Sequence, residues 1–126
     1  MHGLLVEPGH LRLILAGIAT GDRRQFRTAK RGRIALVDRG SKTILGFAEL
    51  HTVREVTYRD YLEQRGNDRM TGDLWAQHRP YYELCLRKVE KARPVDVSGF
   101  HDDGVWMELP DDIGRRVQKS LLDFRG

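Results

Sequence analysis

The chain has 126 residues, of which 40% are hydrophobic and 32% charged, and its formal net charge of +4 is modest; these values are typical of one globular domain with a single core. No apolar stretch approaches the roughly 20 residues that span a bilayer, and no basic region precedes Glu7 and Pro8 as a secretory signal would require. Because Cys85 is the only cysteine, an intramolecular disulfide and a multi-cysteine zinc site are excluded. Without a secretory signal or a membrane span, we expect a cytoplasmic protein.

The first predicted elements are a strand over Gly3–Val6 and a helix that begins at Pro8, since proline fits the first helical turn. An apolar stripe at helical spacing follows: Leu11, Ile14, Leu15 and Ile18. A left-handed cap at Gly17 or Gly21 is expected to end this helix.

A stretch of strong positive charge comes next, and we call its six cations the basic stripe: Arg23, Arg24, Arg27, Lys30, Arg31 and Arg33. Residues 23–33 contain no acidic side chain, and outside them 16 basic residues face 18 acidic ones, so the net positive charge is local. Phosphate backbones are the commonest cellular partner of such a footprint, and we expect RNA or a nucleotide to bind here. A solvated basic face is the alternative interpretation.

The middle of the chain predicts a hairpin, with strands over residues 33–38 and 43–53 joined by a turn at 39–42. Apolar residues fall on both faces of the second strand, as expected for a strand in a barrel or under a helix. Glu49 interrupts this apolar run. It is either a rim carboxylate in water or a polar group inside a pocket.

Short elements fill the C-terminal half. We expect two short helices, one after Thr57 and one from Thr71 to about His78, then strands over residues 81–89, 93–97 and 104–109. A C-terminal helix over residues 111–124 carries one apolar stripe and is expected to pack on the body. The pattern indicates an α+β fold: a single domain over residues 1–126, built as a small mixed barrel of five or six strands with short helices.

Several motifs carry a family resemblance: G-L-L-V-E-P-G-H-L-R-L-I-L-A-G, R-R-Q-F-R, R-G-R-I-A-L-V-D, I-L-G-F-A-E-L, P-V-D-V-S-G and G-V-W-M-E-L. In this order, over residues 3–109, they resemble the ASCH domain of the PUA-like superfamily. The resemblance implies a small barrel with a strand in the segment after the first helix and a cleft between that segment and the barrel. Members of this superfamily mostly read RNA or modified bases.

The resemblance also assigns positions in the cleft. It places Arg27 at the family's arginine, on the cleft floor, and Gln25 at the usual glutamate, where an amide can meet a base edge. The other members of the basic stripe would contact phosphates. The family's lysine has no counterpart, because Asp22 or Ala19 stands there, and Asp68 matches the acidic member only loosely. We therefore do not expect the amidohydrolase chemistry that some small ASCH-like enzymes perform on acylated cytidine.

Recognition of single-stranded RNA also needs aromatic surfaces on which bases stack. The candidates are Tyr58, Trp75, Tyr81 and Tyr82. A core position is the alternative interpretation of Trp75, and Trp106 is expected in the core.

An enzyme is the rival class, either a ribonuclease that works without a metal or a nucleoside hydrolase, assembled from scattered acid and base groups: Asp68, Glu49, His51 or His78. No metal and no cofactor are expected. The one compact group of metal-ligand residue types, at residues 101–103, is typical of a loop. A protein-interaction module whose charge keeps it soluble is the third interpretation.

Overall fold

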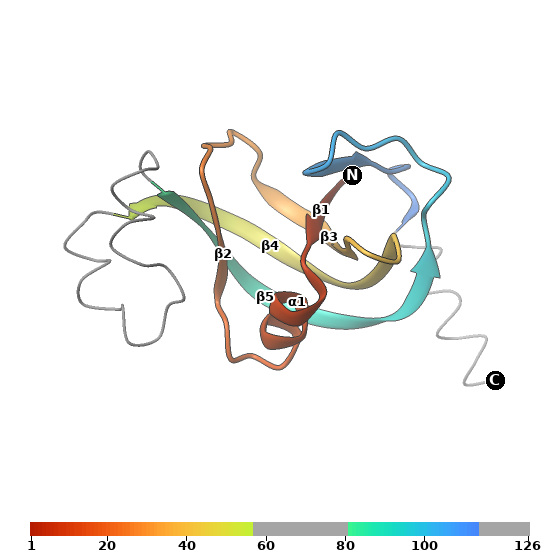
Figure 1. The fold of residues 1–126 in the computed structure, drawn as a ribbon, viewed down its shortest axis with the longest axis horizontal. Helices are drawn as coiled ribbons and strands as arrows, with labels where there is room; N and C mark the ends of the chain where they lie inside the picture. The colour runs from red at the N-terminus through yellow and green to blue at the C-terminus, as the bar shows by residue number, and fades with distance from the viewer. Residues whose placement is uncertain (57–80, 114–126) are drawn as a thin grey trace.

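The structure, a computed structural model, describes residues 1–56 and 81–113 and shows one six-stranded sheet that curls into a half-barrel, with a short helix against it (Figure 1). The elements are β1 (His2–Val6), α1 (Pro8–Leu15), β2 (Gly21–Arg24), β3 (Gly32–Asp38), β4 (Thr43–Val56), β5 (Tyr81–Asp96) and β6 (Trp106–Glu108). The strand order is β2-β5-β4-β3-β1-β6, and every neighbouring pair is antiparallel except β1 and β3.

Most predicted strands are confirmed, including β1 and the β3–β4 hairpin. The predicted break between residues 89 and 93 is wrong, because β5 continues to Asp96. Its pairing with β4 contains shifts in register. Pro94 is tolerated since β2 pairs only with Tyr82–Cys85, which leaves Pro94 on an open edge. The two helices predicted between residues 57 and 80 lie outside the described residues, as does the C-terminal helix beyond Ile113.

Both faces of the sheet are packed. The inner face joins alternate residues of the strands, such as Leu4, Ile34 and Leu84, to Leu11 and Ile14 of α1. Trp106 belongs to the same cluster and is 8% exposed, which confirms its predicted core position. The opposite face has its own cluster: Leu5, Ala35, Val37, Ile44, Phe47, Val97, Met107, Leu109 and Ile113. In residues 1–56 and 81–113, no helix has the length and apolar character that crossing a membrane requires.

Helix α1 has a defined cap at each end. The Glu7 carboxylate accepts hydrogen bonds from the backbone N–H groups of Gly9 and His10, at 2.9 and 3.0 Å. Gly17 has φ +77°, a left-handed conformation that suits glycine, so of the two predicted terminators Gly17 acts as one. Ile18, predicted on the apolar stripe, lies beyond the helix and is 73% exposed.

Strand β2 forms despite a sequence, Gly-Asp-Arg-Arg, with little strand propensity. Only the family resemblance implied a strand in this segment. Its pairing with β5 requires a close approach, because a Cβ on Gly21 would lie 2.9 Å from the Leu84 carbonyl oxygen. Gly21 is therefore part of the strand and not a helix terminator.

A buried ion pair holds β2 in place. Asp22, 8% exposed, is the one buried charged residue in the described part of the chain. The Arg24 guanidinium donates to Asp22 Oδ2 through Nε at 2.9 Å and Nη2 at 2.6 Å, and Nη2 also donates to the Leu5 carbonyl oxygen at 2.6 Å. Strands β1 and β2 are separated by three other strands in the sheet. We call this arrangement the Asp22–Arg24 clamp, because it ties β2 across the open side of the half-barrel.

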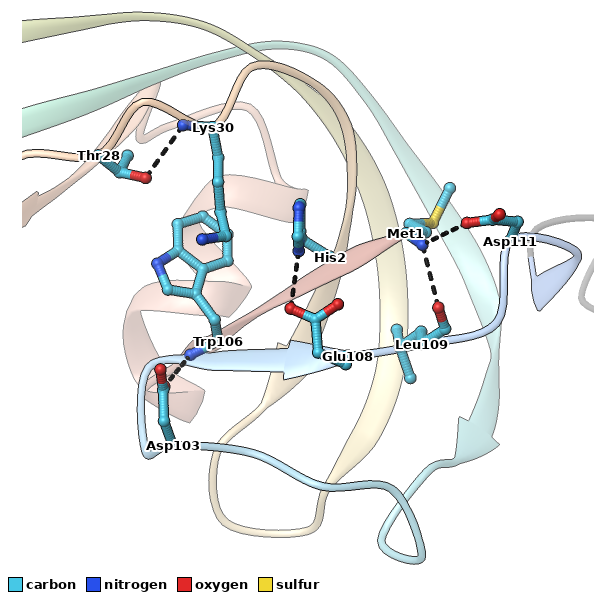
Figure 2. Close-up of polar contacts among 9 residues, drawn as sticks. All are labelled: Met1, His2, Thr28, Lys30, Asp103, Trp106, Glu108, Leu109 and Asp111. Atoms are coloured by element: carbon cyan, nitrogen blue, oxygen red, sulfur yellow. Dashed lines mark hydrogen bonds and ion pairs between the residues drawn. The ribbon is translucent and has the colours of Figure 1, made fainter.

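The segment before β6 is ordered by a second carboxylate. Asp103 Oδ1 accepts from the backbone N–H group of Trp106 at 2.7 Å (Figure 2) and from that of Val105 at 2.9 Å. These hydrogen bonds hold the pKa of Asp103 below its usual range. At the other end of β6, the Met1 amino group donates to the Leu109 carbonyl oxygen and pairs with Asp111 (Figure 2).

Asp22→Asn tests the clamp, because it leaves the Arg24 guanidinium, whose side chain is 11% exposed, without a counterion. We expect the free energy of unfolding, measured by urea denaturation, to fall by about 3 kcal/mol. Glu90→Gln is the control, since it breaks the exposed Arg33–Glu90 pair, which is worth at most about 1 kcal/mol. Equal losses in the two variants would contradict a structural role for the clamp.

Asp103→Ala tests the turn before β6. A carboxylate with a lowered pKa stabilises the fold above about pH 4, and this stabilisation is lost as the pH falls through its folded-state pKa. We therefore expect a lower Tm than wild type at pH 7 and a converging Tm near pH 2. Glu55→Ala, an exposed change on β4, serves as control; a Tm difference independent of pH would refute the assignment.

Candidate nucleic-acid interface

A polar pocket of about 270 Å³ lies where α1 meets β2. Its lining residues are Glu7, His10, Asp22, Arg23, Arg24 and Arg39. The Asp22–Arg24 clamp forms one wall, and the N-terminal turn of α1 supplies Glu7 and His10. Arg39 comes from the turn after β3, where its backbone N–H donates to the Val6 carbonyl oxygen at 2.9 Å.

The orientation of His10 is set by the backbone of β2. Its Nε2 lies 2.8 Å from the Gly21 carbonyl oxygen and 3.8 Å from Asp22 Oδ1. Because a carbonyl oxygen only accepts, Nε2 carries the hydrogen. Glu7, His10 and Arg39 were not predicted as pocket residues, because they lie apart in the chain; Glu7-Pro8 indicated only the start of a helix.

A second group of side chains lies beyond the end of β2, and we call it the barrel mouth: Gln25, Arg27, Tyr81 and Tyr82. The Arg27 guanidinium lies 5.3 Å from the centre of the Tyr82 ring, and Gln25 Nε2 lies 3.4 Å from the Tyr81 hydroxyl. Tyr82 is the direct cross-strand partner of Arg24. The barrel mouth therefore joins the end of the strand that carries the clamp.

The remaining members of the basic stripe have separate surroundings. Lys30 Nζ lies 5.2 Å from the centre of the Trp106 ring, so residues 25–31 reach from β2 across to β6 (Figure 2). Arg31 donates to the backbone carbonyl oxygens of Thr28 and Lys30, and Arg33 lies over the Phe47 ring and pairs with Glu90 at 3.3 Å.

The basic stripe is thus divided among different surroundings instead of forming one uniform surface. Arg23 and Arg24 line the polar pocket, Arg27 covers Tyr82, and Arg33 lies on the sheet face that carries Phe47. Two of the three guanidinium nitrogens of Arg24, Nε and Nη2, are engaged by Asp22 and Leu5, which gives this residue a structural role; its predicted phosphate contact stays a prediction. Gln25, Arg27 and Arg31 are exposed.

The two acid and base candidates that the structure describes, Glu49 and His51, do not line the polar pocket. Glu49 lies in a separate hollow of about 260 Å³ with Arg33, Lys88 and Glu90. A hydrogen bond from Arg87 at 2.8 Å, with Lys88 nearby at 3.4 Å, lowers the pKa of Glu49 and keeps it ionised. His51 is exposed on β4. Two further candidates, Asp68 and His78, and the stacking candidates Tyr58 and Trp75 lie outside the described residues.

Within residues 1–56 and 81–113, no group of three or more metal-ligating side chains assembles. The cluster at residues 101–103 has structural contacts: Asp102 pairs with Lys42 at 3.5 Å, and Asp103 holds the turn before β6. Burial raises the pKa of the Cys85 thiol, with the Glu83 carboxylate adding to the effect. A raised thiol pKa disfavours the thiolate that a nucleophile requires.

No protein-family model and no curated protein matches the chain. Solved structures do match. The crystal structure of ASCH from Zymomonas mobilis superposes with a TM-score of 0.70 at 14% sequence identity, covering 94% of this chain and 93% of that one. A Tyr-to-Phe mutant of the same protein gives 0.69 at 15% identity, covering 94% and 96%, and a Ser-to-Ala mutant gives 0.71 at 16%, covering 94% of each chain. The fold of this chain is therefore that of an ASCH domain, as its sequence motifs indicated.

Proposed function

We propose that this ASCH-fold domain binds single-stranded RNA or a nucleotide at the barrel mouth. The observation that carries the proposal is the Arg27 guanidinium over the Tyr82 ring, beside the buried Asp22–Arg24 clamp. A planar cation on an aromatic ring is a surface on which a base can stack, from the ring side or from the guanidinium side. The clamp supports this surface because Tyr82 pairs with Arg24 across β2 and β5.

Hydrogen bonding at the barrel mouth complements stacking. The Gln25 amide has both a donor and an acceptor, and the Tyr81 hydroxyl beside it has both as well. These groups suit the edge of a base that lies on Tyr82. Unpaired bases present their edges in this way, whereas the bases of an A-form duplex are poorly accessible to side chains. Single strands are therefore the favoured ligand.

Charge supplies the sequence-independent part of binding. Lys30 and Arg31 follow the barrel mouth along the chain, and Lys30 is held over Trp106 toward β6. Phosphates passing along residues 25–31 would meet these cations without further rearrangement of the sheet. Phosphate contacts of this kind fix the position of the ligand and leave base identity to Gln25 and Tyr81.

The hydrolase alternative has less support in the described residues. Glu49 is engaged by Arg87 and lies away from the barrel mouth, in the hollow beside Lys88. Gel analysis of labelled RNA after incubation with the protein, with and without a chelator, distinguishes the two functions. Intact RNA in both samples is the result that the binding proposal expects, and fragments would favour a ribonuclease.

Tyr82→Leu tests the stacking surface. We expect the Kd for a short single-stranded RNA, measured by fluorescence anisotropy, to rise about tenfold, because one stacked base contributes roughly 1 to 3 kcal/mol. Far-UV circular dichroism shows whether β5 is intact. An unchanged Kd in a folded variant would refute the placement of a base on Tyr82.

Arg27→Gln tests the charge at the same place. The slope of log K against log[salt] for single-stranded RNA should become shallower by roughly 0.7, the value for one lost phosphate contact. Lys91→Gln removes one positive charge near the far end of β5, where Lys91 is exposed and paired with Gly46, and should leave the slope unchanged. Equal slopes for Arg27→Gln and wild type would rule out a phosphate at Arg27.

A further inference from the structure

The polar pocket beside α1 has a chemistry different from that of the barrel mouth. Every residue that lines it is charged or a histidine, and no tyrosine, tryptophan or phenylalanine is among them. The lining instead suits a compact, strongly hydrated anion whose oxygen atoms accept several hydrogen bonds at once.

The charges in this pocket are unequally satisfied. Asp22 is neutralised by Arg24, and the Glu7 carboxylate caps the N-terminal turn of α1. Three arginines face two carboxylates among the lining residues, which leaves an excess of one positive charge with His10 neutral. The Arg39 guanidinium makes no hydrogen bond or ion pair with the residues that the structure describes. Arg39 is therefore available to form a bidentate contact with an oxyanion.

The pocket also adjoins the barrel mouth. Arg24 lines the pocket and faces Tyr82 directly across β2 and β5. A nucleotide whose base stacks on Tyr82 would thus carry its phosphate toward Arg39. At about 270 Å³ the pocket has room for one phosphate and part of a ribose.

We infer that this pocket receives a terminal phosphate, a phosphomonoester at the end of an RNA or on a free nucleotide. The inference rests on the proposed function, because it uses the base site at Tyr82. A monoester fits better than an internal diester, because its charge of about −1.5 to −2 attracts it more strongly to a pocket with an excess positive charge, and its third terminal oxygen can accept a further hydrogen bond from Arg39.

The test compares four single-stranded hexanucleotides of one sequence: 5′-phosphorylated, 3′-phosphorylated, phosphorylated at both ends, and hydroxyl at both ends. Anisotropy gives the Kd of each for wild type, Arg39→Gln and Arg12→Gln. Arg12 is the matched control, because it is an exposed arginine on α1, outside the pocket lining and the barrel mouth. Competition with a nucleoside and its 5′-monophosphate asks whether a free nucleotide is sufficient.

We expect one phosphorylated end to tighten binding about tenfold relative to the hydroxyl RNA, since charge-assisted hydrogen bonds are the strong ones. Arg39→Gln should abolish this gain and leave the Kd of the hydroxyl RNA unchanged, whereas Arg12→Gln should preserve the gain. Equal binding of all four RNAs by wild type would overturn the inference while leaving RNA binding intact. The inference would likewise be overturned if Arg39→Gln weakened all four RNAs equally. Absence of binding by every RNA would instead contradict the proposed function.

Discussion

The buried Asp22–Arg24 pair sets the position of the residues on which the candidate site depends. A buried carboxylate or guanidinium is costly to remove from water unless it is paired and hydrogen-bonded, and here each satisfies the other while Arg24 also donates to the Leu5 carbonyl oxygen. This bond links β2 to β1 across a sheet in which three strands separate them. The half-barrel is therefore closed on this side by polar contacts. Because β2 ends at Arg24, the clamp also fixes the position from which residues 25–31 start.

Closure by charged groups has a consequence for function. An apolar seam would have left a surface unsuited to anions, whereas the clamp forms the wall of a pocket that also contains His10 and Arg39. The same strand ends at the barrel mouth, where Arg27 covers Tyr82. One four-residue strand thus supports both a surface suited to a base and a pocket suited to a phosphate, and the proposed RNA binding uses the two together.

Periodicity and turn chemistry predicted the apolar parts of the fold well. Apolar runs in residues 33–38 and 43–53, with the turn between them, predicted the hairpin, and Pro8 with the leucine and isoleucine spacing predicted α1, because burial of apolar side chains decides these elements. Strand β2 could not be derived in this way, since its Gly-Asp-Arg-Arg sequence is ordered by an ion pair and by pairing with β5. The unbroken β5 was missed because strand irregularities, unlike turns, have no strong sequence signal.

The candidate site was only partly accessible from sequence. The density of cations in residues 23–33 is visible in the chain, but their different surroundings are not: Arg24 is distinguished from Arg27 only by the position of Asp22. Glu7, His10 and Arg39 lie apart in sequence and meet because α1, β2 and the turn after β3 converge. No spacing rule connects them.

The most direct test of the central claim is a ¹H–¹⁵N correlation titration of the protein with a short 5′-phosphorylated single-stranded RNA. Saturable shifts of the backbone amides of Gln25, Arg27, Tyr82 and Arg39, with little change at the hollow around Lys88 and Glu90, are the predicted result. Shifts confined to that hollow, or an unchanged spectrum at saturating RNA, would contradict the account.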